Sequence, residues 1–217
     1  MPETTDFLYP FIEGDETDAE TLLEDLARSA TAKWRQSSRL RAATLSQVEG
    51  MLTATAGAIA ERFSAGGRLF TFGNGGSATD AEAVAHLYTE PPWGRPLPAR
   101  SLAEDQAVMT ALGNDVGFEL VFSRQLIAHG RRNDIAMGFS TSGNSDNLMR
   151  AFAEARKQGM LTVGIAGTDG GRMAAEGSPV EQCFVVRSDS VHRIQESQAA
   201  LNNALWAAVQ DALNATS

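Results

Sequence analysis

The sequence predicts an α/β protein, a three-layer sandwich in which helices cover both faces of a mainly parallel β-sheet. Three apolar runs support this prediction, at residues 68–72, 134–139 and 161–166, and each ends in a loop of glycine and small polar residues. Helix-like segments follow the first run from Ala78 and the second run over 147–158. Strands that alternate with helices need crossover connections, which make neighbouring strands parallel. Because the runs lack strict polar alternation, we expect strands that are buried on both faces.

Further elements complete the pattern along the chain. We expect short strands at 97–102 and 184–186, helix-like stretches on both sides of 113–115, and a last helix over 192–213. Together with the three apolar runs, these segments provide the strands and the covering helices that the sandwich requires.

Two amphipathic helices are predicted before the first strand. In the first, over 18–38, apolar side chains recur at every fourth position, and they are Leu22, Leu26, Ala30 and Trp34. In the second, the apolar stripe comprises Leu45, Val48, Leu52, Ile59 and Phe63. Gly66 and Gly67 then form a favourable helix stop. These helices form a platform that covers the sheet or packs against sister subunits, and the stripes do not distinguish the two.

Length and composition limit the classes of protein to which the chain can belong. The 217 residues carry a net charge of −9, which argues against a surface that binds duplex nucleic acid. No apolar run approaches the roughly 20 residues of a membrane-spanning helix, and the lone Cys183 excludes an intrachain disulfide and a cysteine-rich zinc site. The N-terminal segment lacks the basic region of a signal peptide. We therefore expect a cytoplasmic protein without membrane or nucleic-acid partners, with an acidic arm at 1–17 and a single domain over 18–217.

Two of the loops combine the features of an anion-binding site. Ligands of a parallel sheet bind at the carboxyl ends of the strands, which is where both loops lie. Gly75 and Gly76 allow a ligand close to the backbone, and helix N-termini supply free N–H groups. Around the second helix start, hydroxyl groups come from Ser140, Thr141, Ser142 and Ser145. The first loop lacks the spacing of a dinucleotide fingerprint and the Lys of a Walker loop, so a phosphorylated sugar fits better than a nucleotide.

Five motifs follow one another along the chain. They are GNGGSATDA (73–81), GNDVGF (113–118), FSTSGNSDNL (139–148), TDGGRMA (168–174) and RIQE (193–196). In this order they resemble the motifs of the sugar isomerase (SIS) domain proteins, and among these the phosphoheptose isomerases. The resemblance implies a flavodoxin-like SIS fold and a homotetramer with sites at subunit interfaces. It also implies conversion of sedoheptulose 7-phosphate into a heptose 7-phosphate.

The resemblance assigns ligand contacts to residues of this sequence. The sugar-phosphate contacts of the family fall on Asn74, Gly75, Gly76, Asn114, Asp115, Ser140, Thr141, Ser142, Ser145 and Gln195. Of these, the residues from Ser140 to Ser145 form the expected phosphate cradle. Asn74, Asn114 and Asp115 are expected to contact the sugar or to support the site.

The acid–base positions are the point at which this sequence departs from the family. Aldose–ketose isomerisation moves a proton between adjacent carbons and needs a general base and a general acid. The resemblance places the family's His, Glu and second His at Ala83, Leu87 and Asn203, which cannot transfer protons at neutral pH. The family's set can also hold zinc, so the resemblance suggests a zinc cofactor whose usual ligands are missing here.

Two interpretations of Glu82 and His86 stay open. A deletion of one residue before Glu82 would make them an inverted acid–base pair, four residues apart on one helical face. The other interpretation is a surface pair without a catalytic role. Helix geometry favours the surface pair, because one residue rotates a side chain by about 100°.

Three hypotheses for function follow. The first is a phosphoheptose-type isomerase with altered acid–base residues or a different substrate. The second is a non-catalytic phosphosugar sensor or adaptor, similar to the adaptor that associates with the bacterial replication initiator and that also carries Asn at the position of Asn203. The third is an isomerase that acts with a partner subunit, which supplies the missing groups.

Overall fold

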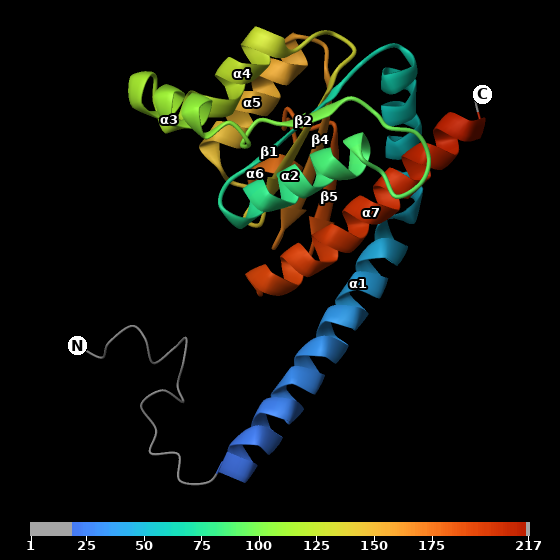
Figure 1. The fold of residues 1–217 in the computed structure, drawn as a ribbon, viewed down its shortest axis with the longest axis vertical. Coiled ribbons are helices and arrows are strands. Elements are labelled where there is room, and N and C mark those ends of the chain that lie inside the picture. Colours follow the sequence, from blue (N-terminus) through green and yellow to red (C-terminus); the bar gives the residue numbers. More distant parts are fainter. Residues whose placement is uncertain (1–18, 216–217) are drawn as a thin grey trace. The chain divides into compact units, whose positions relative to one another are not determined.

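The computed structural model describes residues 19–215 (Figure 1). The predicted acidic arm at 1–17 lies outside these residues. The chain divides into two compact units, and the boundary between Arg39 and Leu40 falls inside the first helix. A single domain over 18–217 therefore stays a prediction. None of the helices in the described range combines the length and the apolar character that a membrane crossing requires.

Helix α1, Ala19–Ser64, joins the two predicted N-terminal helices into one. We expected a break near residues 39–44, but no Gly or Pro occurs there, and Arg, Leu and Ala all favour a continuing helix. The predicted stop after this helix is confirmed. Gly66 has a φ of 78°, and the Gly67 N–H donates to the Arg62 carbonyl at 2.9 Å.

The part of α1 before Leu40 exposes large apolar side chains. Leu23, Leu26 and Trp34 expose 66%, 46% and 66% of their surface. Leu26 and Trp34 belong to the apolar stripe predicted for this helix. Of the predicted stripe, Leu26, Ala30 and Trp34 are exposed.

Five parallel strands form one sheet, as predicted. Their order is β2-β1-β3-β4-β5, and all four neighbouring pairs are parallel. The strands are β1 Leu69–Gly73, β2 Ala99–Ser101, β3 Ile135–Ser140, β4 Leu161–Gly167 and β5 Gln182–Val186. Every residue of β1, β3 and β4 is buried, which accounts for their apolar runs without polar alternation.

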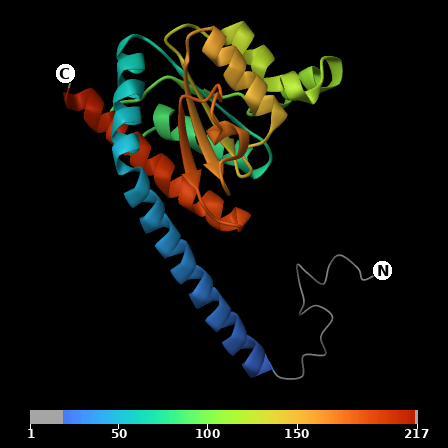
Figure 2. The same ribbon diagram turned by 180° about the vertical axis from the view of Figure 1, so that it is seen from behind.

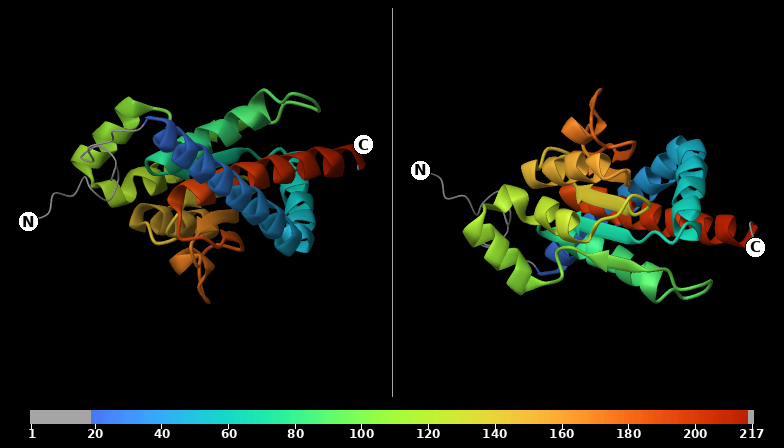
Figure 3. Two further views of the ribbon diagram at one scale, coloured as in Figure 1. Left: turned by 90° about the horizontal axis from the view of Figure 1, so that it is seen from below. Right: turned by 90° about the horizontal axis from the view of Figure 1, so that it is seen from above.

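Helices cover both faces of the sheet (Figures 2 and 3). Beyond α1 they are α2 Gly76–Thr89, α3 Gln106–Asp115, α4 Val121–His129, α5 Asp146–Lys157, α6 Gly171–Ala174 and α7 Val191–Ala215, with a 3-10 turn at Phe118–Leu120. One core cluster joins α2, α7 and the part of α1 after Leu40 to one face of the sheet, and a second joins α4, α5 and α6 to the other. The three-layer α/β sandwich is confirmed. Residues 113–115, expected to separate two helix-like stretches, are the last three residues of α3.

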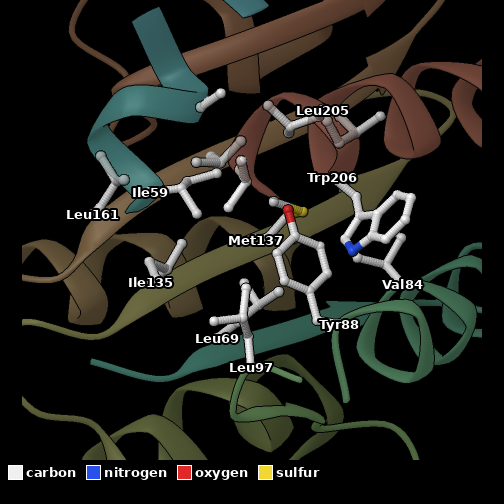
Figure 4. Packing of buried hydrophobic residues seen from close by; sticks show 14 of the residues in the cluster. Ile59, Leu69, Val84, Tyr88, Leu97, Ile135, Met137, Leu161, Leu205 and Trp206 are labelled. Atoms are coloured by element: carbon white, nitrogen blue, oxygen red, sulfur yellow. The ribbon is translucent and has the colours of Figure 1, made fainter. Parts of the chain in front are cut away.

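The first of these clusters holds α2 beside α7. Tyr88 from α2 lies among Ile59, Met137 and Leu205 (Figure 4). Its ring stacks on Phe63 with the two ring centroids 5.8 Å apart. Because this core fixes α2 against α7, residues more than 100 positions apart in the sequence face each other across the two helices.

Candidate functional site

β1 and β3 are neighbours at the point where the strand order reverses. β2 lies on one side of this pair, and β4 and β5 lie on the other. Parallel sheets bind ligands outside the carboxyl ends of the strands at such a switch point. Gly73, the last residue of β1, lies opposite Phe139 in β3. The loops that follow, 74–76 and 140–145, therefore start side by side.

A pair of amide side chains joins these two loops. Asn74 Nδ2 donates to Asn147 Oδ1 at 2.9 Å, and Asn147 Nδ2 donates back to Asn74 Oδ1 at 2.8 Å. Asn147 is buried in the first turn of α5. These bonds engage the Asn74 side chain with α5, and its expected contact to the sugar or to the support of the site stays a prediction.

Three serine hydroxyls gather at the carboxyl end of β3. Ser140 Oγ lies 3.5 Å from Ser142 Oγ and 3.4 Å from Ser145 Oγ, and it accepts a hydrogen bond of 3.1 Å from the Gly143 N–H. Ser145 is the N-cap residue of α5, but its hydroxyl makes no capping bond. The cluster therefore offers hydroxyl groups to an oxyanion next to the positive end of a helix.

The loop after β4 packs against residues 140–145, the serine loop. Thr168 Oγ1 donates to the Thr141 carbonyl at 3.2 Å, so Thr141 contributes its backbone to this contact. Gly143 has a φ of 67°, and a Cβ at this position would collide with the Gly170 carbonyl. Only glycine allows the two loops to pack this closely.

Gln195 joins the start of α7 to the start of α2. Its Nε2 donates to Asp80 Oδ2 at 3.1 Å, and a Cβ on Gly76 would lie 2.6 Å from the same nitrogen. The Gln195 amide therefore lies close to the backbone of Gly76. A hollow of about 470 Å³ lies at this contact, and it is lined by Gly76, Thr79, Asp80, His192, Gln195 and Glu196. Gly75, by contrast, has open space around its α-carbon.

Asp80 is the functional candidate that the sequence analysis missed. Its carboxyl is half-buried, and burial raises its pKa, while the hydrogen bond from Gln195 lowers the pKa by a smaller amount. Asp80 lies within the GNGGSATDA motif, but nothing in that motif indicates a partner. The partner follows 115 residues later in the chain, and only the packing of α2 on α7 brings the two together.

The three positions that the resemblance assigns to the family's acid–base groups lie close together. Ala83, Leu87 and Asn203 line one hollow of about 140 Å³ between α2 and α7, and Asp80 lines it as well. Ala83 and Leu87 offer no ligating atom, and residues 19–215 contain no cluster of three His, Cys, Asp or Glu side chains suited to a metal. The side chains at this place do not fit a zinc ion.

Glu82 and His86 lie on a different side of α2. They line a hollow of about 210 Å³ together with Arg100, Ser101 and Glu104, next to β2. The rotation of about 100° per helical residue accounts for the separation of this pair from the Ala83 side. The placement favours the surface-pair interpretation over the catalytic one.

Asn114 and Asp115 end helix α3, which projects beyond the sheet (Figure 1). Both side chains are exposed, and Asn114 Nδ2 donates to Asp115 Oδ1 at 2.8 Å. Neither residue lines the two hollows between α2 and α7.

Comparison with known proteins agrees with the resemblance of the motifs. The chain matches the family model of the SIS domain over residues 34–167. A phosphoheptose isomerase from Rhodospirillum rubrum is 40% identical over 164 residues, which is 73% of this chain and 84% of the relative. A phosphoheptose isomerase from Aquifex aeolicus is 37% identical over 183 residues, which is 82% of this chain and 93% of the relative.

Solved structures give the same result. The phosphoheptose isomerase from Neisseria gonorrhoeae has a TM-score of 0.80 at 32% identity, and the match covers 86% of this chain and 99% of that one. The enzyme from Francisella tularensis has a TM-score of 0.78 at 26% identity, with 85% of this chain and 98% of that one covered. On its fold, its strand-end loops and these matches, the chain belongs to the SIS domain family, alongside the phosphoheptose isomerases.

Proposed function

We propose that this protein binds a sugar phosphate at the carboxyl ends of β1 and β3 and interconverts its ketose and aldose forms. The proposed substrate is sedoheptulose 7-phosphate or a closely related sugar phosphate, as the phosphoheptose-type relatives suggest. The sugar would extend from the serine loop across Gly76 towards the hollows between α2 and α7.

The observation that carries the proposal is the serine cluster at the start of α5. A phosphate group needs several donors at short range, and here they are the hydroxyls around Ser140 and the first N–H groups of α5. Asp146, in the first turn of α5, adds a negative charge beside the cradle, but its carboxylate is paired with the Arg172 guanidinium. The cradle thus suits an anion even though the whole chain carries a net charge of −9.

We also infer that the protein assembles as a homotetramer. The exposed apolar side chains on the first part of α1 need cover, and a sister subunit provides it. The resemblance places sites at subunit interfaces, so the contacts expected of Asn114 and Asp115 would be made to the ligand of a neighbouring subunit.

The proposal is tested by incubating purified protein with sedoheptulose 7-phosphate, with and without added zinc, and following aldose formation. Turnover is the expected result in both conditions, because the side chains between α2 and α7 do not fit a zinc ion. Binding is measured in parallel as the rise in melting temperature with ligand concentration. Binding without turnover would leave a phosphosugar sensor or adaptor, and no binding would remove the proposal altogether.

The cradle itself is tested by the double variant Ser142→Ala with Ser145→Ala. Each lost hydrogen bond to the charged phosphate costs about 1.5–3 kcal/mol, or about tenfold to a hundredfold in Kd. The ligand-dependent rise in melting temperature should shrink accordingly. Ser46→Ala with Ser64→Ala, on the exposed side of α1, serves as the control and should leave it unchanged. An equal rise in both double variants would contradict the cradle assignment.

A further inference from the structure

Asp80 lines both hollows between α2 and α7. It lines the larger hollow, which opens beside Gly76, and the smaller hollow, in which Ala83, Leu87 and Asn203 replace the family's acid–base residues. Asp80 therefore provides a carboxylate both beside Gly76 of the first loop and beside the positions of the family's acid–base groups.

His192 contributes a second ionisable group to the larger hollow. It lies in the first turn of α7, three residues before Gln195, and its exposed side chain lines the hollow. Glu196 is the remaining titratable residue that lines this hollow. A carboxylate and an imidazole thus face one space, from two helices that the core holds together.

We infer that Asp80 and His192 are the acid–base pair of this protein. Asp80 moves the proton between C1 and C2 of the sugar, and His192 gives a proton to the C2 oxygen and takes one from the C1 oxygen. The inference rests on the proposed function, because it assigns residues to that reaction. It explains how an isomerase can work with Ala83, Leu87 and Asn203 at the family's acid–base positions.

The reaction balances with these two groups alone. The Asp80 carboxylate takes a proton from C1 of the ketose, and the C–H electron pair forms the C1–C2 double bond. The C2 carbonyl oxygen takes a proton from the His192 imidazolium, which completes an enediol. The Asp80 carboxylic acid then returns its proton to C2, and the O1 hydroxyl proton passes to the imidazole as the C1 aldehyde forms. No oxidant, reductant or metal enters the sequence.

The surroundings of Asp80 suit a proton carrier. Partial burial raises the pKa of its carboxyl, which makes the carboxylate a stronger base than an exposed aspartate. The hydrogen bond from Gln195 holds Oδ2 of Asp80 at 3.1 Å from Nε2, and Asp80 lines both hollows. Gln195 is itself held against Gly76, so the first loop, the amide and the carboxylate form one connected group.

Asp80→Asn and His192→Gln test the inference. Asn keeps the shape of Asp80 and its acceptor for Gln195, so binding of sedoheptulose 7-phosphate should persist, measured as the ligand-dependent rise in melting temperature. Turnover should fall at least about a hundredfold in each variant, which is the usual contribution of a general acid or base. In D₂O, wild-type protein should incorporate deuterium at C1 of the ketose, and Asp80→Asn should not.

Asp211→Asn and His129→Gln are the matched controls, because both residues are exposed and lie outside the hollows between α2 and α7. Both controls should keep wild-type turnover. Glu82→Gln and His86→Gln test the competing pair on the other side of α2. Loss of turnover in these two variants, with Asp80→Asn and His192→Gln still active, would overturn the inference.

The failure of the inference can be told apart from the failure of the proposed function. If wild-type protein turns over its ligand and Asp80→Asn does so equally well, the inference alone is overturned. If wild-type protein binds the sugar phosphate without deuterium exchange, the inference and the proposed catalysis fail together, while the proposed binding site stands.

Discussion

Asp80 lies at a half-buried position, where burial opposes the ionisation of its carboxyl. Burial raises the pKa of the carboxyl above its ordinary value of 3.8, and the Gln195 hydrogen bond offsets part of that rise. A raised pKa means that the folded state binds this proton more tightly than the unfolded chain does. The contribution of Asp80 to stability is therefore most favourable below the ordinary carboxyl pKa and falls as the pH rises through the folded-state pKa.

Asp80→Asn should reveal this effect in urea unfolding between acid and neutral pH. At pH 7, we expect the variant to have a free energy of unfolding equal to or higher than that of wild type. The difference should disappear once the pH lies below 3.8, where Asp80 is protonated in both states. Asp211→Asn, at an exposed position on α7, should show no such trend. A variant that is less stable than wild type at pH 7 would mean that the charge of Asp80 supports the fold.

At this scale the sequence predicts residue types well and their partners poorly. The hydroxyls from Ser140 to Ser145 were recognisable because they follow a strand and precede a helix, so local order alone brings them together. Asp80 was not recognisable, because its environment depends on a residue of α7. Glu82 and His86 could act as an acid and a base, but their position around the axis of α2 places them next to β2.

At the scale of elements, the packing of the serine loop 140–145 against the loop after β4 depends on glycine. Gly143 has a positive φ, and a Cβ at this position would strike the backbone of the loop after β4. The FSTSGNSDNL motif (139–148) and the TDGGRMA motif (168–174) are thus held against each other by backbone contact. The shape of the cradle follows from this contact.

Gly143→Ala should therefore damage both stability and binding. The collision and the positive φ should lower the free energy of unfolding by about 1–3 kcal/mol and should reduce the ligand-dependent rise in melting temperature. The control is Gly177→Ala, which also has a positive φ of 75° but open space around it. We expect this control to lose stability through backbone strain alone and to keep its ligand response. Equal loss of binding in both variants would contradict the role of the contact.

Most elements of the fold were predictable because their signals are local. The strands were found because buried apolar runs end in glycine-rich loops, and the helices that follow were found from their periodicity. Helix α1 was divided wrongly, because the gap in the apolar stripe between Trp34 and Leu45 resembles a boundary although the backbone has no reason to break there. The boundary between the two compact units, at Arg39 and Leu40, falls in this same interval.

For the whole molecule, the exposed stripe on the first part of α1 predicts assembly. Leu26→Glu with Trp34→Glu should reduce the mass measured by light scattering below that of four chains. The reason is that charged side chains then replace the apolar side chains that contact a sister subunit. Lys33→Glu, exposed on the same helix, should leave the mass unchanged. A tetramer that survives the double substitution would contradict the role of this stripe, and a wild-type monomer would contradict the assembly itself.

The arrangement of the whole molecule was the least predictable level. The sequence predicted a parallel sheet, but the order β2-β1-β3-β4-β5 and the pairing of α2 with α7 are long-range properties. The resemblance placed three family positions at Ala83, Leu87 and Asn203, and the structure gathers all three in one hollow. The resemblance could not predict which residues take over acid–base catalysis, because that depends on which other side chains line the same hollow.

The reciprocal bonds between Asn74 and Asn147 join the two ligand loops through neutral groups. Amide side chains do not titrate, and an uncharged link is little affected by ionic strength. A phosphate monoester gains its second negative charge near about pH 6. Across that pH the spacing of the two loops should stay constant, so any change in affinity reports the ionisation of the sugar phosphate or of its acid–base partners and not a rearranged receptor.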